Sequence, residues 1–329
     1  MGNSGNGPRL LVVRLGAMGD IIHTLPAAAT LRRSFPGAHL TWLVESRWAE
    51  LLAGNPYVDH VELLERGSIG SWWRSARRLR QRRYDLAVDF QGLLKSAISA
   101  TFARPEILYG FHASQLREKQ AAWFYSRAIE VKARHVVEMN LELAAAAGAS
   151  NPASLFPLPA GKPEGTLPPG PFVLANPLAG WVSKQWPPDR YTTLAIRLRQ
   201  ELDLTLVVNG PPSAEGQLEA VKGAHVHVSG LQGLIDATRR ARAVVGLDSG
   251  PMHLAAALGI PGVALYGPTD PARNGPYGNS MAVFRSPDAV TSYKRRFAPD
   301  ESMLAIPVEE VVASLKKRIA AQNARGSVA

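Results

Sequence analysis

Apolar and polar positions follow one another along the first half of the chain in blocks that predict strands and helices in turn. Runs of apolar residues predict strands over residues 9–16, 38–46 and 84–92. The segments predicted as helices are residues 20–36, 47–55, 71–83 and 93–103. Strands and helices in this repeated order predict a doubly wound parallel β-sheet.

A second series of the same kind follows residues 151–171, which are rich in Pro and Gly and predict an interdomain linker. The strands expected beyond it are residues 171–177, 204–210, 225–230, 243–249 and 262–267, and the helices are residues 190–202, 234–241 and 253–259. We therefore expect an α/β protein with one Rossmann-like domain over residues 1–160 and another over residues 161–329. The amphipathic segment 307–322 is predicted as a terminal helix that could pack back across the domain junction.

The composition is that of a globular protein with a large core. The chain has 329 residues, 46% of them hydrophobic, which is enough for two domains. No apolar run approaches the roughly 20 residues that span a bilayer, and we expect no signal peptide. The absence of cysteine excludes disulfides and thiolate chemistry and agrees with a cytoplasmic location.

Basic residues exceed acidic ones, 37 to 27, which gives a net charge of +10. No acidic residue lies between Arg66 and Tyr84, and that segment contains Arg74, Arg77, Arg78, Arg80, Arg82 and Arg83. Such a run attracts nucleic acid, anionic lipid or a phosphorylated substrate, or it is a solvated helix face. No aromatic-basic RNA signature or DNA-binding module accompanies it, so we expect no nucleic-acid partner.

A first candidate site follows the first predicted strand. Gly16 and Gly19 would permit a tight turn there, and Asp20 begins the next helix. The spacing lacks the third glycine of a dinucleotide fingerprint and the Lys-Ser/Thr of a nucleotide triphosphate loop. Asp20 is therefore either a general base on a hydroxyl or an N-cap.

Two further candidates lie in the second half. Lys184 is expected in a polar loop after a strand, where it either neutralises phosphate charge or is an ordinary surface lysine. Residues 248–253 join a buried strand to a helix that should open just after Ser249, and a helix N-terminus of this kind binds anions. The alternative is that Asp248 or Ser249 only caps the helix.

No cluster of His, Asp and Glu has metal-ligand spacing, and we see neither a D-x-D pair nor a nucleophile elbow or serine triad. These absences favour an enzyme that uses no metal and no cofactor. Charge stabilisation would then come from Lys, His and helix N-termini.

Together these stretches resemble the ADP-heptose:lipopolysaccharide heptosyltransferases, and most closely their type I members. The resemblance is carried by LLVVRLGAMGDIIHTLPAA, DFQGLLKSA, LREKQAAWFYSR, SKQWP and DSGPMHLAAALGIPGVALYGPTDP, which are spread over nearly the whole chain. It implies a GT-B fold of two facing Rossmann-like domains. It also implies an ADP-heptose donor in the C-terminal domain and an acidic Kdo-lipid A acceptor at the N-terminal one.

The resemblance also implies roles for single residues. Asp20 matches the catalytic base and Lys184 the lysine that stabilises the phosphates. The positions that match donor contacts are Gly19, Glu215 at the adenosine ribose, Asp248 at the sugar, and Ser249, Gly250, Pro251, Met252 and His253 at the diphosphate. Those near acceptor contacts are Arg66, Lys95 and Arg117. Met139 stands where the type I pattern commonly has arginine, which affects the acceptor and not the donor.

The implied activity is an inverting, metal-independent transfer of heptose to the Kdo region of Kdo-lipid A in inner-core biosynthesis. The enzyme would be cytoplasmic and peripheral to the inner face of the membrane, with the arginine-rich segment on the anionic leaflet. One alternative is a heptosyltransferase II or an ADP-heptose transferase acting on another glycan. A more distant one is a noncatalytic protein that binds a sugar nucleotide or nucleic acid.

Overall fold

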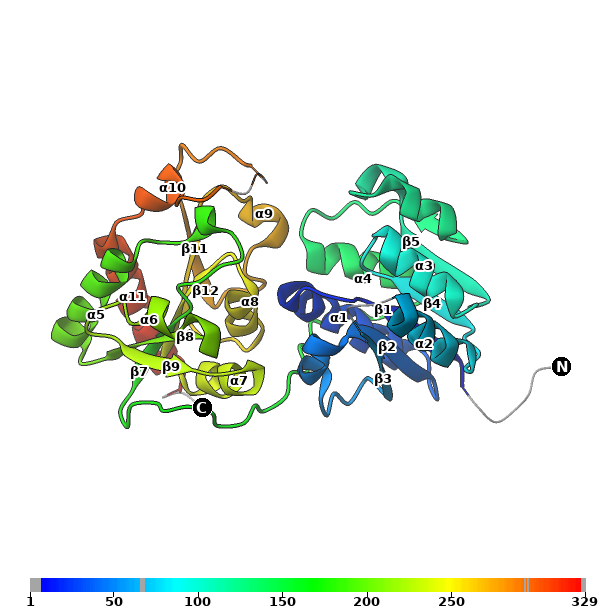
Figure 1. The fold of residues 1–329 in the computed structure, drawn as a ribbon, viewed down its shortest axis with the longest axis horizontal. Coiled ribbons are helices and arrows are strands. Elements are labelled where there is room, and N and C mark those ends of the chain that lie inside the picture. The colour runs from blue at the N-terminus through cyan, green and yellow to red at the C-terminus, as the bar shows by residue number, and fades with distance from the viewer. Residues whose placement is uncertain (1–6, 66–68, 293, 295, 327–329) are drawn as a thin grey trace. The chain divides into compact units, whose positions relative to one another are not determined.

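The computed structural model describes residues 7–65, 69–292, 294 and 296–326. The chain divides into two compact units, Met1–Pro159 and Ala160–Ala329, shown in blue to green and in green to red (Figure 1). Each unit contains a six-stranded sheet flanked by helices. The α/β fold class with two doubly wound parallel sheets is confirmed. Among the described helices, none combines the length and apolar content needed to cross a bilayer.

The first unit has its strands in the order β3-β2-β1-β4-β5-β6, and every pair is parallel. The strands are β1 (Arg9–Val13), β2 (His39–Glu45), β3 (His60–Leu64), β4 (Leu86–Asp89), β5 (Ile107–Phe111) and β6 (Arg127–Ile129). The chain winds outward from β1 to β3 and then, from β4, in the opposite direction. The carboxyl ends of β1 and β4 therefore meet at the reversal, where open α/β sheets bind ligands.

The helices of this unit are α1 (Met18–Ser34), α2 (Ile69–Arg80), α3 (Leu94–Phe102) and α4 (Val136–Ala146), with the 3₁₀ helices η1 (Ser46–Leu52), η2 (Ala113–Gln115) and η3 (Lys119–Phe124). The sequence pattern predicted a helix over residues 47–55, and the structure has the 3₁₀ helix η1 there instead. Gly54, at a φ of 65°, and Pro56 follow it closely. This connector is short, and short connectors commonly adopt the tighter 3₁₀ form.

The core of the first unit lies between its sheet and its helices. Strands β1, β2 and β4 are almost wholly buried, because a parallel sheet is covered on both faces. Helix α1 is buried on nearly all sides, and its small residues Ala27, Ala28 and Ala29 permit close packing. Helix α4 packs directly against it. The start of α1 is therefore held firmly at the end of β1.

The second unit repeats the architecture with the order β12-β11-β10-β7-β8-β9, again all parallel. Its strands are β7 (Phe172–Ala175), β8 (Thr205–Gly210), β9 (His225–Val228), β10 (Ala243–Leu247), β11 (Gly262–Tyr266) and β12 (Met281–Arg285). Here the reversal falls between β7 and β10. The loops after these two strands are the expected place for a ligand.

The helices of the second unit are η4 (Val182–Lys184), α5 (Pro188–Leu202), η5 (Pro212–Ala214), α6 (Glu215–Leu218), α7 (Leu231–Arg240), α8 (Gly250–Ala257), α9 (Pro271–Asn274), α10 (Glu301–Leu304) and α11 (Val308–Gly326). Helix α8 begins directly after Ser249, as the sequence predicted. Helix α11 packs against α5 and β11 and buries Val311, Val312 and Leu315 in the core of this unit.

Residues 151–171 contain no helix or strand, but their later part is not a free tether. The Lys162 N–H donates to Gln232 O at 3.2 Å, and the Gly230 N–H donates to Glu164 Oε2 at 2.7 Å. At Gly161, with a φ of 84°, an added Cβ would lie 2.5 Å from Asp236 N. This part of the segment is thus docked on the start of α7.

Candidate functional site

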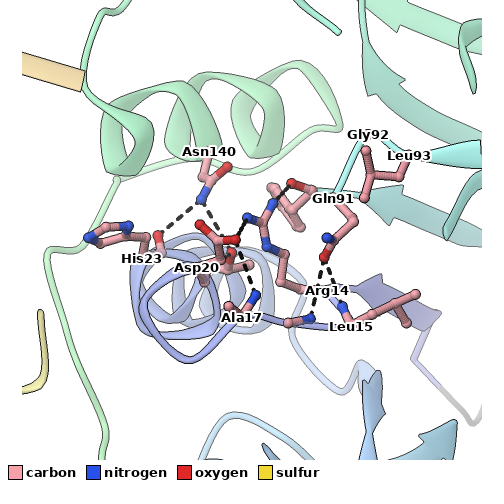
Figure 2. A network of polar contacts seen from close by, with 12 residues as sticks. Arg14, Leu15, Ala17, Asp20, His23, Gln91, Gly92, Leu93 and Asn140 are labelled. Carbon is pink, nitrogen blue, oxygen red and sulfur yellow. Dashed lines mark hydrogen bonds and ion pairs between the residues drawn. The ribbon is translucent and has the colours of Figure 1, made fainter. Parts of the chain in front are cut away.

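The first cluster of polar side chains lies where β1 ends and α1 begins (Figure 2). Arg14 directly follows β1, and Asp20 is the third residue of α1. Arg14 Nη2 lies 2.7 Å from Asp20 Oδ2, and the Ala17 N–H donates to the same oxygen at 3.2 Å. The Asp20 side chain is 34% exposed, so this carboxylate is oriented by two donors and still reaches solvent. A carboxylate held in this way can accept a proton from a bound hydroxyl group.

The structure places Asp20, Gly16 and Gly19 somewhat differently from the prediction made from the sequence. Ala17, not Asp20, is the N-cap of α1, and the Asp20 carboxylate binds its N–H. Gly19 is a buried residue inside the first turn of α1. Gly16 does lie in the turn, where an added Cβ would be 2.9 Å from Trp48 Nε1. A side chain at position 16 would therefore displace the Trp48 ring, whereas the turn itself does not explain Gly19.

Arg14 is a site residue to which the sequence analysis assigned no role. Its side chain is only 9% exposed, and Nη1 donates to the carbonyl oxygen of Phe90, just after β4. The guanidinium thus bridges the ends of β1 and β4 and presents its other nitrogen to Asp20 (Figure 2). The signal in the sequence was an arginine placed directly after an apolar strand.

Gln91 holds the loop between β1 and α1. Its Oε1 accepts from the Leu15 N–H at 3.1 Å and from the Gly16 N–H at 3.4 Å (Figure 2). Gln91 is in turn positioned by Asp89, whose Oδ1 accepts from the backbone N–H groups of Gln91 at 2.9 Å and Gly92 at 3.3 Å. The end of β4 therefore fixes the loop that carries Asp20.

Asp89 is fully buried, and burial raises the pKa of its carboxyl group. Hydrogen bonds oppose this rise: Ser96 Oγ and Tyr125 Oη each donate to Asp89 Oδ2 at 2.8 Å. Burial also raises the pKa of Tyr125, so the phenol remains a donor. The buried carboxyl thus organises the loop and is shielded from any bound ligand.

Asn140 ties α4 to the start of α1. Its Nδ2 donates to His23 O at 3.1 Å and to Thr24 Oγ1 at 3.3 Å, and Thr24 Oγ1 donates to Asp20 O at 2.8 Å. Asn140 comes from 117 residues further along the chain than His23, so no local pattern reveals the contact. Met139 is its half-buried neighbour.

The three residues predicted to contact the acceptor have different surroundings in the structure. Arg66 lies outside the described residues. Lys95 Nζ is 3.3 Å from Glu45 Oε1, and Arg47 Nε is 3.3 Å from Glu45 Oε2. Glu45 is buried at the end of β2, while the two cations are 46% and 49% exposed. Arg117 is exposed and makes no hydrogen bond or ion pair with any residue that the structure describes.

The second cluster joins Lys184, Asp248 and His253 in the second unit. Lys184 ends η4 in the loop after β7, and Asp248 directly follows β10. Lys184 Nζ lies 2.5 Å from Asp248 Oδ2, and His253 Nε2 lies 3.8 Å from Asp248 Oδ1. The side chains are 16%, 10% and 7% exposed, respectively. Residues far apart in the sequence thus form one compact polar group beside the reversal of the sheet.

Helix α8 begins at this group. Ser249 is its N-cap, but the Ser249 hydroxyl donates to Leu247 O at 3.3 Å and caps no N–H of the helix. The Asp248 carboxylate is engaged by Lys184, so the capping alternative explains neither side chain. Lys184 Nζ also lies 4.4 Å from the centre of the Trp181 ring, a cation–π contact that orients the ammonium.

Glu215 is not part of this group. It is the exposed first residue of α6, after β8, and its side chain binds no described residue. Tyr266, at the end of β11, does lie near the cluster: burial raises the pKa of its phenol, and the negative charge of Asp248 raises it further. Over the described parts of the chain, no group of three or more His, Cys, Asp or Glu residues has the arrangement of a metal site.

The chain as a whole is similar to known glycosyltransferases. The model of glycosyltransferase family 9 (heptosyltransferase) matches residues 72–296. Lipopolysaccharide heptosyltransferase 1 of Pseudomonas aeruginosa is 33% identical over 298 residues, which cover 83% of this chain and 82% of the relative. The structure of Escherichia coli heptosyltransferase WaaC with ADP is 26% identical, with a TM-score of 0.76 over 94% of this chain and 99% of that one. A second WaaC structure, with ADP-2-deoxy-2-fluoro heptose, has a TM-score of 0.74 over the same shares of both chains.

Proposed function

Because this chain belongs to glycosyltransferase family 9, the heptosyltransferases, we propose that it transfers heptose from ADP-heptose to the Kdo region of Kdo-lipid A in lipopolysaccharide inner-core biosynthesis. The observation that carries the proposal is the similarity to lipopolysaccharide heptosyltransferase 1 over most of both chains. The WaaC structures with ADP and with an ADP-heptose analogue support ADP-heptose as the donor. The GT-B arrangement has an acceptor domain and a donor domain, and we assign these roles to the first and second units.

In this proposal Asp20 is the general base. Transfer with inversion is a single displacement in which the acceptor hydroxyl attacks the anomeric carbon, loses its proton to Asp20, and the C–O bond to ADP breaks. Arg14 and the Ala17 N–H orient one carboxylate oxygen, Oδ2, which keeps the partly exposed carboxylate in a defined position. A defined position matters because a general base must lie within hydrogen-bonding reach of the proton that it removes.

The Lys184–Asp248–His253 group is the proposed donor site. The diphosphate gains negative charge as the C–O bond breaks, and a preorganised ammonium stabilises that charge. The Asp248 carboxylate and the Trp181 ring fix the Lys184 ammonium in place before the donor binds. The Gly250 N–H, at the start of α8, is proposed to bind the same diphosphate, whereas Pro251 has no N–H and the Met252 and His253 N–H groups donate to Ser249 O.

The acceptor is acidic, and we propose that Lys95 and Arg117 contact it. Lys95 is held by the buried Glu45 at the end of β2 and remains half exposed, so it can bind a carboxylate or phosphate. The alternative acceptor is a glycan that already carries heptose or has another structure. This alternative is favoured by a departure from the type I pattern that the chain resembles, which commonly has arginine at the position of Met139, next to Asn140 in α4.

The proposed reaction is tested by incubating the full chain with ADP-heptose and Kdo-lipid A and measuring the products by mass spectrometry. We expect release of ADP and a product with the mass of one heptose added to Kdo-lipid A. NMR should show that the anomeric carbon of the transferred heptose has the configuration opposite to that in the donor. We also expect the rate to persist with excess chelator. Product only from an acceptor that already carries heptose would favour the alternative, and loss of activity that added divalent cation restores would contradict metal independence.

The location at the inner face of the membrane is proposed from helix α2. Trp72 anchors one face of this helix: its Nε1 donates to Ser99 Oγ at 3.1 Å, and its ring lies 4.7 Å from that of Phe102. Trp73 is 50% exposed, and the side chains exposed with it on α2 include Arg74, Arg77 and Arg80. Exposed Trp and Arg on one helix face suit an anionic lipid surface, where the lipid acceptor would lie.

The arginines of this segment are not equivalent. Arg78 Nε donates to the buried Glu62 at 2.6 Å, and Arg78 Nη2 donates to Leu63 O at 3.0 Å, so Arg78 holds α2 on β3. Arg77 makes no hydrogen bond or ion pair with the residues that the structure describes. Charge reversal at Arg78 would damage the fold, whereas reversal at Arg77 and Arg80 tests the surface.

We expect Arg77→Glu with Arg80→Glu to weaken binding to phosphatidylglycerol vesicles by roughly tenfold or more, since each basic residue near such a surface contributes about 1 kcal/mol. Co-sedimentation measures this binding, with phosphatidylcholine vesicles as the uncharged reference. The matched control is Arg33→Glu with Arg127→Glu, which makes the same change in net charge at exposed positions on other elements. Equal loss in the two double variants, or none in either, would show that α2 is an ordinary solvated face.

A further inference from the structure

A cavity of about 130 Å³ lies at the opposite edge of the first sheet from Asp20. Its lining residues come from the amino ends of β1 and β2 and from the segment between α2 and β4, namely Gly7, Arg9, Gly37, His39, Thr41, Arg82 and Tyr84. Arg9 begins β1 and Arg14 follows its end, so five residues, roughly 16 Å of strand, separate this cavity from the candidate base site. A ligand here would not share atoms with the proposed reaction.

Positive charge dominates the lining. Arg9 and Arg82 are among the lining residues, with His39, and no acidic residue lines the cavity. None of these three side chains forms a hydrogen bond or an ion pair with a residue that the structure describes. Of the nearby carboxylates, Asp85 accepts from the backbone N–H of Arg9 at 2.6 Å, and Glu62 pairs with Arg78. The guanidinium groups of Arg9 and Arg82 therefore have no ion-pair partner among the described residues.

Two buried hydroxyl groups complete the lining. Thr41 is 1% exposed and Tyr84 is 2% exposed, and their hydroxyls lie beside each other with no other hydrogen-bond partner among the described residues. Burial raises the pKa of the Tyr84 phenol, while the nearby Thr41 hydroxyl and the charges of Arg82 and Arg9 oppose the rise. The raised pKa means that the phenol keeps its proton and can donate it. Buried hydroxyls without partners are uncommon, because leaving them unsatisfied costs free energy.

The space suits a small anion. A single water needs only about 10–15 Å³, so the cavity has room for several non-hydrogen atoms. The backbones of Gly7 and Gly37 form one wall, and an added Cβ at Gly7 would lie 2.2 Å from Gly37 C. Arginine forks and hydroxyl donors together are the groups that bind phosphate oxygens. We propose that this cavity is a binding site for a phosphate group, separate from the donor and acceptor sites of the transferase.

The phosphate could belong to a free ion or to the headgroup of a lipid. Arg82 lies two residues after α2, the helix whose exposed face is proposed to meet the membrane. A phosphomonoester headgroup and inorganic phosphate offer the same oxygens to Arg9, Arg82 and the two hydroxyls. The two sources are distinguished by comparing inorganic phosphate with vesicles of phosphatidylcholine that do or do not contain phosphatidate.

The test is a calorimetric titration of the full chain with sodium phosphate at constant ionic strength, with sodium chloride as the reference. We expect Arg82→Gln and Tyr84→Phe each to weaken phosphate binding at least about tenfold, because each removes a donor to a charged ligand. Arg83→Gln is the matched control: it removes the same charge from the neighbouring exposed residue, which does not line the cavity. Melting temperatures measured in sodium chloride identify any variant that fails to fold. Thr41→Val removes the second hydroxyl group of the lining and tests it in the same way as Tyr84→Phe.

The Lys184→Ala variant separates this site from the proposed donor site. Phosphate binding that survives Lys184→Ala and is lost in Arg82→Gln supports a phosphate site in the cavity. Whichever of inorganic phosphate and phosphatidate binds more tightly identifies the source of the phosphate group. Binding lost in Lys184→Ala and kept in Arg82→Gln would overturn the proposal, as would equal behaviour of Arg82→Gln and Arg83→Gln or no binding of either probe. Heptose transfer by Tyr84→Phe should equal that of the unchanged chain, so the activity assay tests the proposed function independently.

Discussion

Asp20→Asn should lower the rate of heptose transfer about a hundredfold or more, while ADP binding stays unchanged. The amide keeps the size of the carboxylate and an oxygen for the Ala17 N–H, but it cannot take the proton of the acceptor hydroxyl. The measurement is the single-turnover rate with Kdo-lipid A, together with ADP affinity by calorimetry. Wild-type turnover in this variant would remove Asp20 from the mechanism.

The Arg14–Asp20 ion pair makes a second variant necessary. Asp20→Asn leaves the largely buried Arg14 guanidinium without its carboxylate, and an unpaired buried charge is destabilising by itself. Asp20→Asn combined with Arg14→Gln removes both charges. If Asp20 is the base, the double variant stays as slow as the single one. Recovery of turnover in the double variant would instead assign the loss to the unpaired arginine.

Lys184→Ala should lower turnover by about a hundredfold, with a smaller loss of ADP affinity. The ammonium is held by Asp248 and Trp181 before the donor binds, and the loss of a preorganised charge partner costs more in the transition state than in the ground state. The rate and the affinity are measured as for Asp20. A lowered affinity with an unchanged single-turnover rate at saturating ADP-heptose would show that Lys184 only binds the donor.

Two controls accompany this experiment. Lys222→Ala removes an exposed lysine from the same unit and should leave turnover unchanged. Lys184→Ala combined with Asp248→Asn avoids leaving the buried Asp248 carboxylate without its cation. If the ammonium acts on the diphosphate, this double variant remains at least as slow as Lys184→Ala. A double variant that recovers wild-type turnover would limit Lys184 to neutralising Asp248.

The elements that the sequence predicted best are those buried on both faces. Strands β1, β2, β10 and β11 form almost continuous apolar runs, because a parallel sheet is covered by helices on each side. Strands β3, β5, β6 and β12 were not predicted. Three of them, β3, β6 and β12, lie at or near the edges of their sheets and are only partly buried, so their apolar pattern is weak.

The sequence indicated where along the chain polar residues follow buried strands, but it did not indicate which of these side chains contact one another. Polar residues directly after buried strands, such as Asp248 after β10, mark the carboxyl edge of a parallel sheet from the sequence alone. The partner of Asp248 is Lys184, 64 residues away, and no spacing rule indicates that these two meet. For the same reason no role was predicted for Arg14, which is anchored on Phe90, 76 residues further along.

By itself the sequence determined the two doubly wound sheets, the edge of each that carries polar residues, and the start of α8, because these depend on local runs of apolar residues and on turns. Only the tertiary structure decided that Arg14 binds Asp20, that Asn140 ties α4 to α1, and that Lys184 and His253 converge on Asp248. The cavity beside Arg82 and Tyr84 also appears only when three distant segments meet. The physical reason is that polar contacts form between whichever side chains the packed strands and helices bring within about 3 Å, and the order of residues along the chain does not encode that distance.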